Sequence, residues 1–167
     1  KAHNPTLGWI WYISRLAAII AAAFLITTAG VRGFSYMKAY FGNGYEDYKN
    51  GELVYSADSG YETLIYDMHL KIDGVRYYDD GTLELRYKTW KSLFSDSIDW
   101  TFNLNGEFLT DEKGNKYYFS TGNSNGNKVC HSQLFFEDFP QDVKTIIIDT
   151  DVNGQNIHCE IPVPEVN

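Results

Sequence analysis

The sequence predicts a mainly β protein, an immunoglobulin-like antiparallel β-sandwich preceded by a single transmembrane α-helix. Three observations on the 167 residues lead to this prediction. An uncharged apolar run, residues 16–31, lies between two arginines near the beginning of the chain. After residue 60, Gly-containing turn signals recur at short intervals, and the runs between them are rich in β-branched and aromatic residues. No helical periodicity competes with these strand patterns.

The apolar run, LAAIIAAAFLITTAGV, is bounded by Arg15 and Arg32. As a helix it would span about 24 Å, against about 30 Å for the hydrocarbon core of a bilayer. The residues from Leu7 to Ile13 are also apolar, and Arg15 can extend its charged end toward the headgroups. We therefore expect a span of about 22 to 25 residues that begins near Leu7. Residues 1–33 are assigned to an N-terminal segment and this transmembrane helix.

The residues that flank the run favour a membrane interface, and they make the lipid bilayer an expected partner. Aromatic rings with a polar end prefer the headgroup layer, and basic side chains extend toward it. The predicted anchor residues are Trp9, Trp11, Tyr12, Arg15, Arg32 and Tyr36. Three alternatives stay open for the run: a buried helix of a soluble domain, a secretory signal peptide with small residues at 28–30, and a pilin-type helix.

Charge is divided unevenly along the chain. Residues 1–40 contain four basic groups and no acidic one, and the rest carries 10 Lys and Arg against 22 Asp and Glu. A domain this acidic repels a phosphate backbone, so no nucleic-acid partner is expected. The basic residues on the two sides of the apolar run balance and do not set its orientation. We expect the C-terminal domain to be extracytoplasmic, because large domains are translocated largely regardless of charge and its cysteines could pair there.

Residues 34–60 are expected to form a juxtamembrane stalk, of which residues 35–41 could prolong the helix up to a break at Gly42, and residues 61–167 the β-sandwich. The predicted strands are residues 64–72, 83–90, 98–104, 116–120, 128–136, 144–150 and 157–163. Short strands joined by hairpin dipeptides are typical of an antiparallel sandwich. Asp73-Gly74 is predicted to be one of the turns, and the polar residues 122–127 a loop that could serve as a recognition tip.

Period-two alternation is clearest between residues 82 and 90. Leu83, Leu85 and Tyr87 are predicted to share one face of a strand, and Glu84 and Arg86 the other. The order of cysteine and tryptophan that marks antibody domains is absent, because both tryptophans of the domain precede both cysteines. The prediction is therefore limited to the sandwich architecture and does not include membership of the antibody domains.

One segment matches the calcium-loop pattern of an EF-hand. Asp149, Asp151, Asn153 and Glu160 occupy the ligand positions, with Gly154 where the sharp turn is needed. An EF-hand requires a helix on each side, whereas a β-branched run precedes this segment and prolines follow it. A β-hairpin that turns at Asn153-Gly154 is the alternative, and neither a metal nor another cofactor is predicted.

The two cysteines each neighbour a histidine, in Cys130-His131 and His158-Cys159. Successive side chains of a strand point to opposite faces, so each Cys and its adjacent His cannot easily bind one zinc ion. Two arrangements stay open. A disulfide between Cys130 and Cys159 would stabilise the domain by about 3 kcal/mol, and two buried free thiols are the other possibility.

No catalytic motif is evident, and we do not expect an enzyme. Walker, dinucleotide-binding and H-E-x-x-H motifs are absent, and no G-x-S-x-G nucleophile elbow is expected. The acidic residues near predicted turns, which are expected to be solvated, are Asp79, Asp80, Asp96 and Asp99. Aromatic rings on a surface can stack on a sugar or a peptide. The candidates for such a binding surface, for which core packing is the alternative, are Trp90, Trp100, Tyr77 and Tyr78.

Three segments carry a resemblance to a known family. They are Arg-Leu-Ala-Ala at 15–18, LTDEKGNKYYF at 109–119, and F-x-x-F-P at 136–140 followed by KTIIID. The layout of residues 9–163 resembles the extracytoplasmic part of bacterial membrane-bound anti-sigma-factor-like proteins. The resemblance implies a non-catalytic, immunoglobulin-like outer domain and, in the family, a cytoplasmic portion that sequesters a sigma factor. Too few residues precede the apolar run here for that portion, so the chain is expected to be a fragment or an anchored accessory subunit.

The predicted function is that of a single-pass, membrane-anchored sensor or binding domain with a protein partner in or outside the membrane. The first alternative is an accessory subunit of a membrane complex. Its helix would approach partner helices closely through small residues, namely Ala17, Ala18, Ala21 and Ala22. The second alternative is a carbohydrate-binding module.

Overall fold

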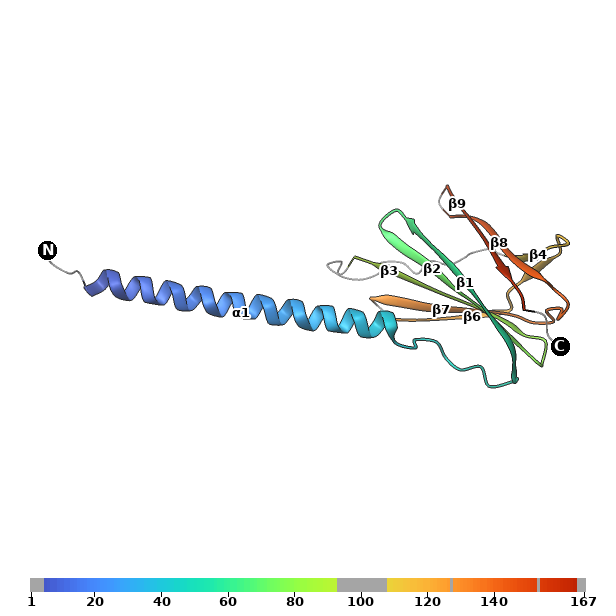
Figure 1. Ribbon diagram of the computed structural model, residues 1–167, viewed down its shortest axis with the longest axis horizontal. Helices are drawn as coiled ribbons and strands as arrows, with labels where there is room; N and C mark the ends of the chain where they lie inside the picture. Colours follow the sequence, from blue (N-terminus) through green and yellow to red (C-terminus); the bar gives the residue numbers. More distant parts are fainter. Residues whose placement is uncertain (1–4, 93–107, 127, 153, 165–167) are drawn as a thin grey trace. The chain divides into compact units, whose positions relative to one another are not determined.

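The computed structural model describes residues 5–92, 108–126, 128–152 and 154–164 (Figure 1). The chain divides after Phe41 into two compact units. The predicted strand at 98–104 and the candidate residue Trp100 lie outside the described residues.

The first unit contains one helix, α1 (Pro5–Phe41), of 37 residues. Its length is about 55 Å at 1.5 Å per residue. Hydroxyl groups within it bond to the helix's own carbonyl oxygens: Thr28 Oγ1 donates to Phe24 O at 2.7 Å, and Ser14 Oγ to Trp11 O at 2.9 Å. The helix continues beyond the predicted end at residue 33 and stops before Gly42, a residue that commonly ends helices.

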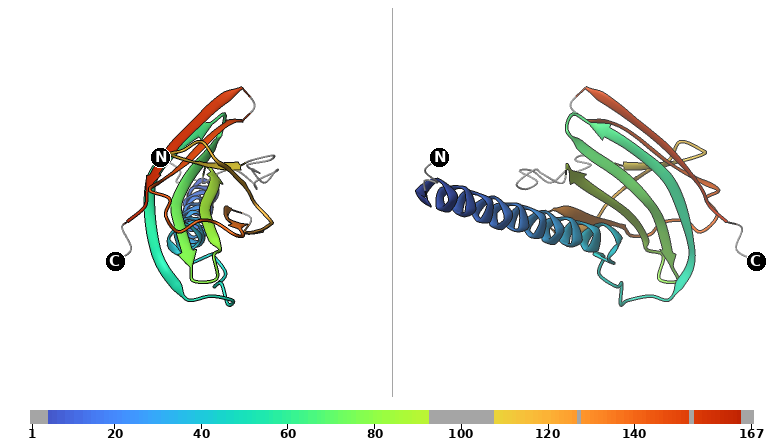
Figure 2. Two further views of the ribbon diagram at one scale, coloured as in Figure 1. Left: turned by 90° about the vertical axis from the view of Figure 1, so that its right-hand side faces the viewer. Right: turned by 60° about the vertical axis from the view of Figure 1, so that its left-hand side comes forward.

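The described residues of the second unit form nine strands in two antiparallel sheets (Figures 1 and 2). Sheet A has, in spatial order, β1 (Leu53–Ile65), β2 (Met68–Tyr78), β3 (Leu83–Lys91), β7 (Val129–Phe136) and β6 (Thr121–Asn125). Sheet B has β5 (Lys116–Tyr118), β4 (Phe108–Asp111), β8 (Thr145–Val152) and β9 (Gln155–Pro162). The mainly β class with one preceding apolar helix is therefore confirmed.

One hydrophobic core joins the two sheets. Leu70, Leu85 and Phe136 enter it from sheet A, and Ile146 and Ile161 from sheet B. A core shared by the inner faces of two sheets is the arrangement of a sandwich. The immunoglobulin-like strand order is not confirmed, because β1, β2 and β3 are consecutive in one sheet, whereas an immunoglobulin chain crosses to the second sheet after its second strand.

Five predicted strands, at 83–90, 116–120, 128–136, 144–150 and 157–163, are confirmed as β3, β5, β7, β8 and β9. The predicted strand at 64–72 is instead the end of β1, a turn and the beginning of β2. Tyr66 in that turn has a φ of 55°. The predicted loop at 122–127 is largely strand β6, which pairs with β7.

Asp73-Gly74 is a bulge inside β2 and not the predicted turn. In the pairing of β2 with β3, Ile72 faces Tyr87 and Gly74 faces Arg86, so Asp73 is an extra residue without a cross-strand partner position. Gly74 has a φ of 142°, and a Cβ there would lie 2.1 Å from the carbonyl oxygen of Ala57. Only glycine fits this position without displacing the neighbouring strand.

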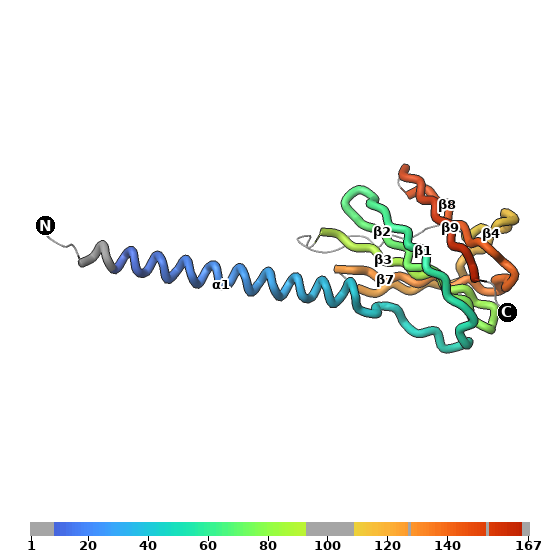
Figure 3. Tube along the Cα trace, in the orientation of Figure 1, coloured from blue at the N-terminus to red at the C-terminus, as the bar shows by residue number. Residues whose placement is uncertain are grey.

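The predicted stalk, residues 34–60, has three parts in the structure. Its beginning belongs to α1, and its end belongs to β1. Residues 42–52 between them are neither helix nor strand, and we call them the strap (Figure 3). The Asn-Gly pairs at 43–44 and 50–51 account for this irregular course, since such pairs favour turns over regular structure.

Candidate functional site

The central strands β3 and β7 of sheet A are buried on both faces. One face contributes to the core, and the other carries polar side chains that are nevertheless buried. Glu84, Arg86 and Gln133 have exposed fractions of 0%, 6% and 2%. The strap lies over this outer face, as its hydrogen bonds to Gln133 and to β2 show. The outer face of sheet A and the strap together form the candidate functional site.

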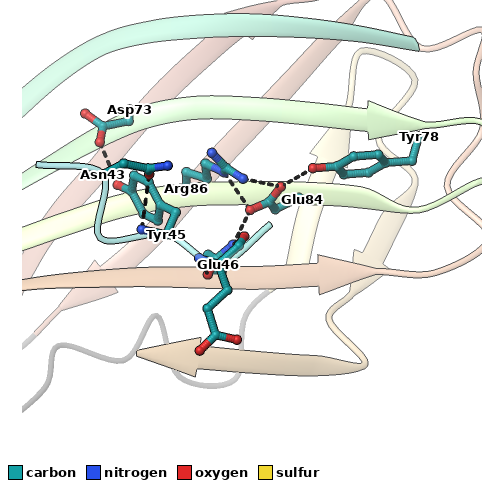
Figure 4. A network of polar contacts seen from close by, with 8 residues as sticks. Asn43, Tyr45, Glu46, Asp73, Tyr78, Glu84 and Arg86 are labelled. Atoms are coloured by element: carbon teal, nitrogen blue, oxygen red, sulfur yellow. Dashed lines mark hydrogen bonds and ion pairs between the residues drawn. The ribbon is translucent and has the colours of Figure 1, made fainter. Parts of the chain in front are cut away.

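A buried ion pair lies at the centre of the site (Figure 4). Glu84 and Arg86 are two residues apart on β3, so their side chains share a face. Arg86 Nε donates to Glu84 Oε1 at 2.6 Å, and Arg86 Nη2 to Oε2 at 3.0 Å. A buried carboxylate is tolerated when it is paired and its remaining lone pairs accept hydrogen bonds.

Two neighbours from sheet A complete the hydrogen bonding of Glu84. The Tyr78 hydroxyl donates to Glu84 Oε2 at 2.6 Å, and Gln133 Nε2 donates to Oε1. Burial, together with this bond to a carboxylate, raises the pKa of Tyr78 to about 12. The phenol therefore remains a donor at physiological pH.

The first half of the strap docks through Tyr45 and Glu46. The Tyr45 hydroxyl donates to Asp73 Oδ2 at 2.6 Å, and its ring lies 4.9 Å from the Arg86 guanidinium carbon. Burial and the hydrogen bond to Asp73 raise the pKa of Tyr45. The Glu46 backbone exchanges two hydrogen bonds with the Gln133 amide, 2.9 Å from its N–H to Oε1 and 2.8 Å from Nε2 to its carbonyl oxygen.

The second half of the strap docks at the turn between β2 and β3. The Tyr48 hydroxyl donates to Asp80 Oδ2 at 2.6 Å, and its ring lies 4.5 Å from the Tyr78 ring. Glu52 N–H donates to Asp79 Oδ1 at 2.8 Å, and Asp79 N–H donates to Glu52 O at 3.0 Å. Asp79 and Asp80 are exposed turn residues, as predicted, and both also hold the strap through these bonds, which the sequence did not indicate.

Gly44 brings the strap into direct contact with β7. A Cβ at Gly44 would lie 2.2 Å from Cδ2 and 2.5 Å from Cγ of the His131 imidazole. The Tyr45 ring packs edge-on against the same imidazole, with 4.9 Å between the ring centroids. Any larger residue at position 44 must push the strap away from the sheet or displace the buried His131.

A polar hollow of about 230 Å³ opens beside Tyr45. It is lined by strap and sheet together, with Asn43 and Tyr45 from the strap and two acidic and two basic side chains from β1, β2 and β3. The charged lining residues are Asp58, Asp73, Arg76 and Arg86. Such a lining suits a small polar group that offers both a donor and an acceptor rather than an apolar ligand.

The predicted aromatic binding surface is wrong for the three residues that the structure describes. Trp90 is 6% exposed and stacks on His69 with ring centroids 5.0 Å apart. Tyr77 is 6% exposed, and its hydroxyl donates to Phe139 O at 3.1 Å. Tyr78 belongs to the buried Glu84 network. The physical reason is that β2 and β3 carry these rings where the strands are buried, and that Tyr77 belongs to the core between the two sheets.

The predicted calcium residues lie on the β8–β9 hairpin and not between two helices. His158 Nδ1 lies 3.6 Å from Asp149 Oδ2, and His158 Nε2 lies 3.4 Å from Glu160 Oε1. Asp151 Oδ1 accepts a hydrogen bond from Gly154 N at 2.7 Å. Among the described residues, which do not include Asn153, no three His, Cys, Asp or Glu side chains are placed to hold one metal ion. The EF-hand alternative is therefore not supported.

Cys130 and Cys159 are buried free thiols, and the disulfide alternative is not observed. Cys130 lies on β7 of sheet A and Cys159 on β9 of sheet B. Burial raises the pKa of the Cys159 thiol, so this group stays protonated. His158 is exposed beside the buried Cys159, as the expectation of opposite faces requires.

The expectation that the sequence contains no G-x-S-x-G pattern is wrong. Residues 122–126, GNSNG, fit the letters of the G-x-S-x-G nucleophile elbow. That elbow places its serine at a sharp turn from a strand into a helix. Here Ser124 lies within β6, and its hydroxyl is 2.9 Å from that of Ser132 on the adjacent strand. The structural context of a serine nucleophile is not present at this position.

The predicted anchor residues lie along α1, which is long and apolar enough to span a membrane. Its most apolar 18-residue window has a mean hydropathy of 1.9, and none of that window is buried. The guanidinium carbon of Arg15 lies 3.6 Å from the centroid of the Trp11 ring. Trp9 packs edge-on against Tyr12, and near the other end Tyr36 stacks on Tyr40 at 6.3 Å.

In comparisons with known proteins, no family model matches the chain, and no curated protein or solved structure gives a significant match.

Proposed function

We propose that this chain is a single-pass membrane protein whose C-terminal β-sandwich acts outside the cytoplasm as a non-catalytic sensor or binding domain, as in anti-sigma-factor-like proteins. The observation that carries the proposal is the complete exposure of an apolar helix. Phe24, Leu25 and Ile26 in the middle of α1 have exposed fractions of 69%, 67% and 73%.

The free-energy cost of exposing apolar side chains to water favours a lipid environment for such a helix. Leaving one large apolar side chain in water instead of burying it costs about 1.5 to 3 kcal/mol. A continuous apolar surface of this kind is rare in soluble monomers and marks a membrane or protein contact. The hydroxyls of Ser14 and Thr28 bond within the helix, which satisfies them without water.

The strap and the hollow support a sensing or binding role for the second unit. The hollow is polar and open, and its lining comes from the strap as well as the sheet. The strap is also the segment of chain that continues directly from α1. A group that binds in the hollow would therefore contact the part of the domain nearest in sequence to the membrane helix.

Membrane insertion is tested by extraction of the full chain from membranes. We expect the wild-type chain to resist alkaline carbonate and to require detergent. An arginine near the middle of a membrane helix costs about 2.5 to 3.5 kcal/mol, so Leu25→Arg should release most of the chain or prevent insertion. Met37→Arg, near the end of α1, is the matched control and should behave as wild type. Wild-type chain that is released by carbonate alone would contradict the proposal.

Orientation is tested on Glu137→Cys, at an exposed position beyond β7. Because Cys130 and Cys159 are buried, the new thiol is the one expected to react in folded protein. A membrane-impermeant maleimide should label it in intact cells. Labelling that appears only after permeabilisation would place the domain on the cytoplasmic side.

The accessory-subunit alternative is favoured by the small residues on α1. Ala17 and Ala21, like Ala18 and Ala22, are one helical turn apart, and small residues with this spacing let membrane helices approach closely. Native mass spectrometry after mild detergent extraction should then show a stoichiometric partner. The carbohydrate-binding alternative has lost its support at Trp90, Tyr77 and Tyr78, which are buried.

A further inference from the structure

The strap is held on sheet A mainly by separate polar contacts and not by a continuous strand pairing. Its bonds to the sheet are made by the Tyr45 and Tyr48 hydroxyls and by the backbone of Glu46 and Glu52. Beside these bonds, the Tyr45 ring packs on His131 and the Tyr48 ring on Tyr78 and Phe135. A segment held by isolated hydrogen bonds and a few ring contacts opens locally at a lower free energy than the core does. The strap is therefore the part of the site that can open first.

The sheet beneath the strap does not depend on it for charge compensation. Glu84 accepts its hydrogen bonds from Tyr78, Arg86 and Gln133, all residues of sheet A. When the strap leaves, the carboxylate therefore keeps its counterion and its donors. Opening would avoid the main cost of disrupting a buried ion pair, which is an unpaired charge.

Two contacts between the strap and β7 respond differently to opening and to substitution. Gln133 would exchange two bonds to the Glu46 backbone for bonds to water, at little net cost. Gly44, in contrast, is seated on the His131 imidazole with no room for a side chain. A methyl group at position 44 must therefore push the strap away from the sheet or displace His131, whereas the hydrogen bonds among Glu84, Tyr78, Arg86 and Gln133 do not involve this position.

We propose that residues 42–52 form a reversible latch over the outer face of sheet A. Its release uncovers a preformed polar surface of Glu84, Arg86 and Gln133 while the sandwich stays folded. The latch continues directly into α1, so its opening changes the chain between the domain and the helix from a docked segment to a free one. The biological role of the latch rests on the proposed sensor function. The opening and closing of residues 42–52 is a property of the β domain alone.

The test is amide hydrogen exchange on the full chain in detergent micelles, which does not depend on membrane orientation. Local opening of the latch predicts that the Glu46 amide exchanges about 100-fold faster than the Arg86 amide in β3. Gly44→Ala should accelerate exchange at Glu46 about tenfold further and leave Arg86 unchanged. Asp47→Ala, an exposed strap residue, is the matched control and should change neither.

Two results would overturn the latch. One is exchange at Glu46 that is as slow as exchange at Arg86, which would make the strap part of the global folding unit. The other is an equal acceleration of both amides by Gly44→Ala. Tyr45→Phe, which removes the bond to Asp73 and keeps the ring, provides a second variant should Gly44→Ala not fold. The proposed function would fail separately, in the carbonate extraction, so the two failures are distinguishable.

Discussion

Asp111 is a buried carboxylate that holds the turn between β4 and β5. It accepts hydrogen bonds from the backbone N–H of Lys113 at 2.9 Å and of Asn115 at 2.8 Å. The Asn115 side chain and the Tyr117 hydroxyl donate to its other oxygen at 2.7 and 2.8 Å. Burial alone would raise the pKa of Asp111, but these donors outweigh it and lower the pKa to about 2. The ionised form is therefore part of the folded structure.

The stability of the domain should fall in acid because of Asp111. Its pKa is about 2 in the folded chain and about 3.9 when unfolded, so its contribution is complete above about pH 4 and is lost as the pH falls toward 2. Asp111→Asn should lower the urea midpoint at pH 7 and make it less dependent on pH between 4 and 2. Urea unfolding monitored by near-UV circular dichroism measures both. An unchanged pH dependence in the variant would exclude this role for Asp111.

At the scale of elements, the bulge in β2 shapes the site. Asp73 is the extra residue of the β2–β3 pairing, and its carboxylate meets the Tyr45 hydroxyl at 2.6 Å and the Lys88 ammonium at 3.7 Å. Bulges bend a strand and redirect a side chain. Figure 2 shows the strong curvature of β1 and β2. The close approach of Gly74 to Ala57 is what permits the bulge.

Gly74→Ala should destabilise the domain more than Gly81→Ala. Both positions have positive φ, so an alanine at either is strained by about 1 to 3 kcal/mol. Only at Gly74 would the new methyl group also collide with the backbone, 2.1 Å from Ala57 O, whereas it meets nothing within 4 Å at Gly81. Thermal unfolding of the two variants side by side is the measurement. Equal losses would show that the bulge yields without cost.

At the scale of the whole molecule, the two cysteines report on the integrity of the sandwich. Cys130 and Cys159 are 2% and 4% exposed and lie in different sheets. A reagent reaches both thiols when the layers separate, whereas opening of the strap alone leaves Cys159 in the core. Their reactivity therefore distinguishes global from local opening.

Thiol labelling with Ellman's reagent should be slow in the native chain and complete in denaturant. We expect both thiols to react in 6 M guanidinium without a reductant, about two per chain, because they are free and buried. Gly44→Ala should not accelerate Cys159 labelling, since the latch opens without separating the sheets. A requirement for reductant would instead establish the Cys130–Cys159 disulfide.

Local patterns predicted the parts of the fold that local physics determines. Leu83, Leu85 and Tyr87 alternate toward the core as their spacing indicates, and the strands of that kind are confirmed. The same alternation placed Glu84 on the other face but could not show what covers it. The strap docks through pairs far apart in sequence, 87 residues in the case of Glu46 and Gln133. No periodicity encodes such a contact, so the candidate site was not predictable from sequence alone.

The contact between Arg15 and Trp11 bears on hydrophobic mismatch. The Arg15 guanidinium carbon lies 3.6 Å from the centroid of the Trp11 ring, one helical turn toward the N-terminus. The charge of Arg15 is therefore displaced toward the N-terminus from the Arg15 Cα. If α1 crosses a bilayer as proposed, the apolar length is then set by residues 12–31, about 30 Å, instead of the shorter run that begins after Arg15. That length equals the hydrocarbon thickness of an ordinary bilayer, so neither tilting of the helix nor local thinning of the lipid is required.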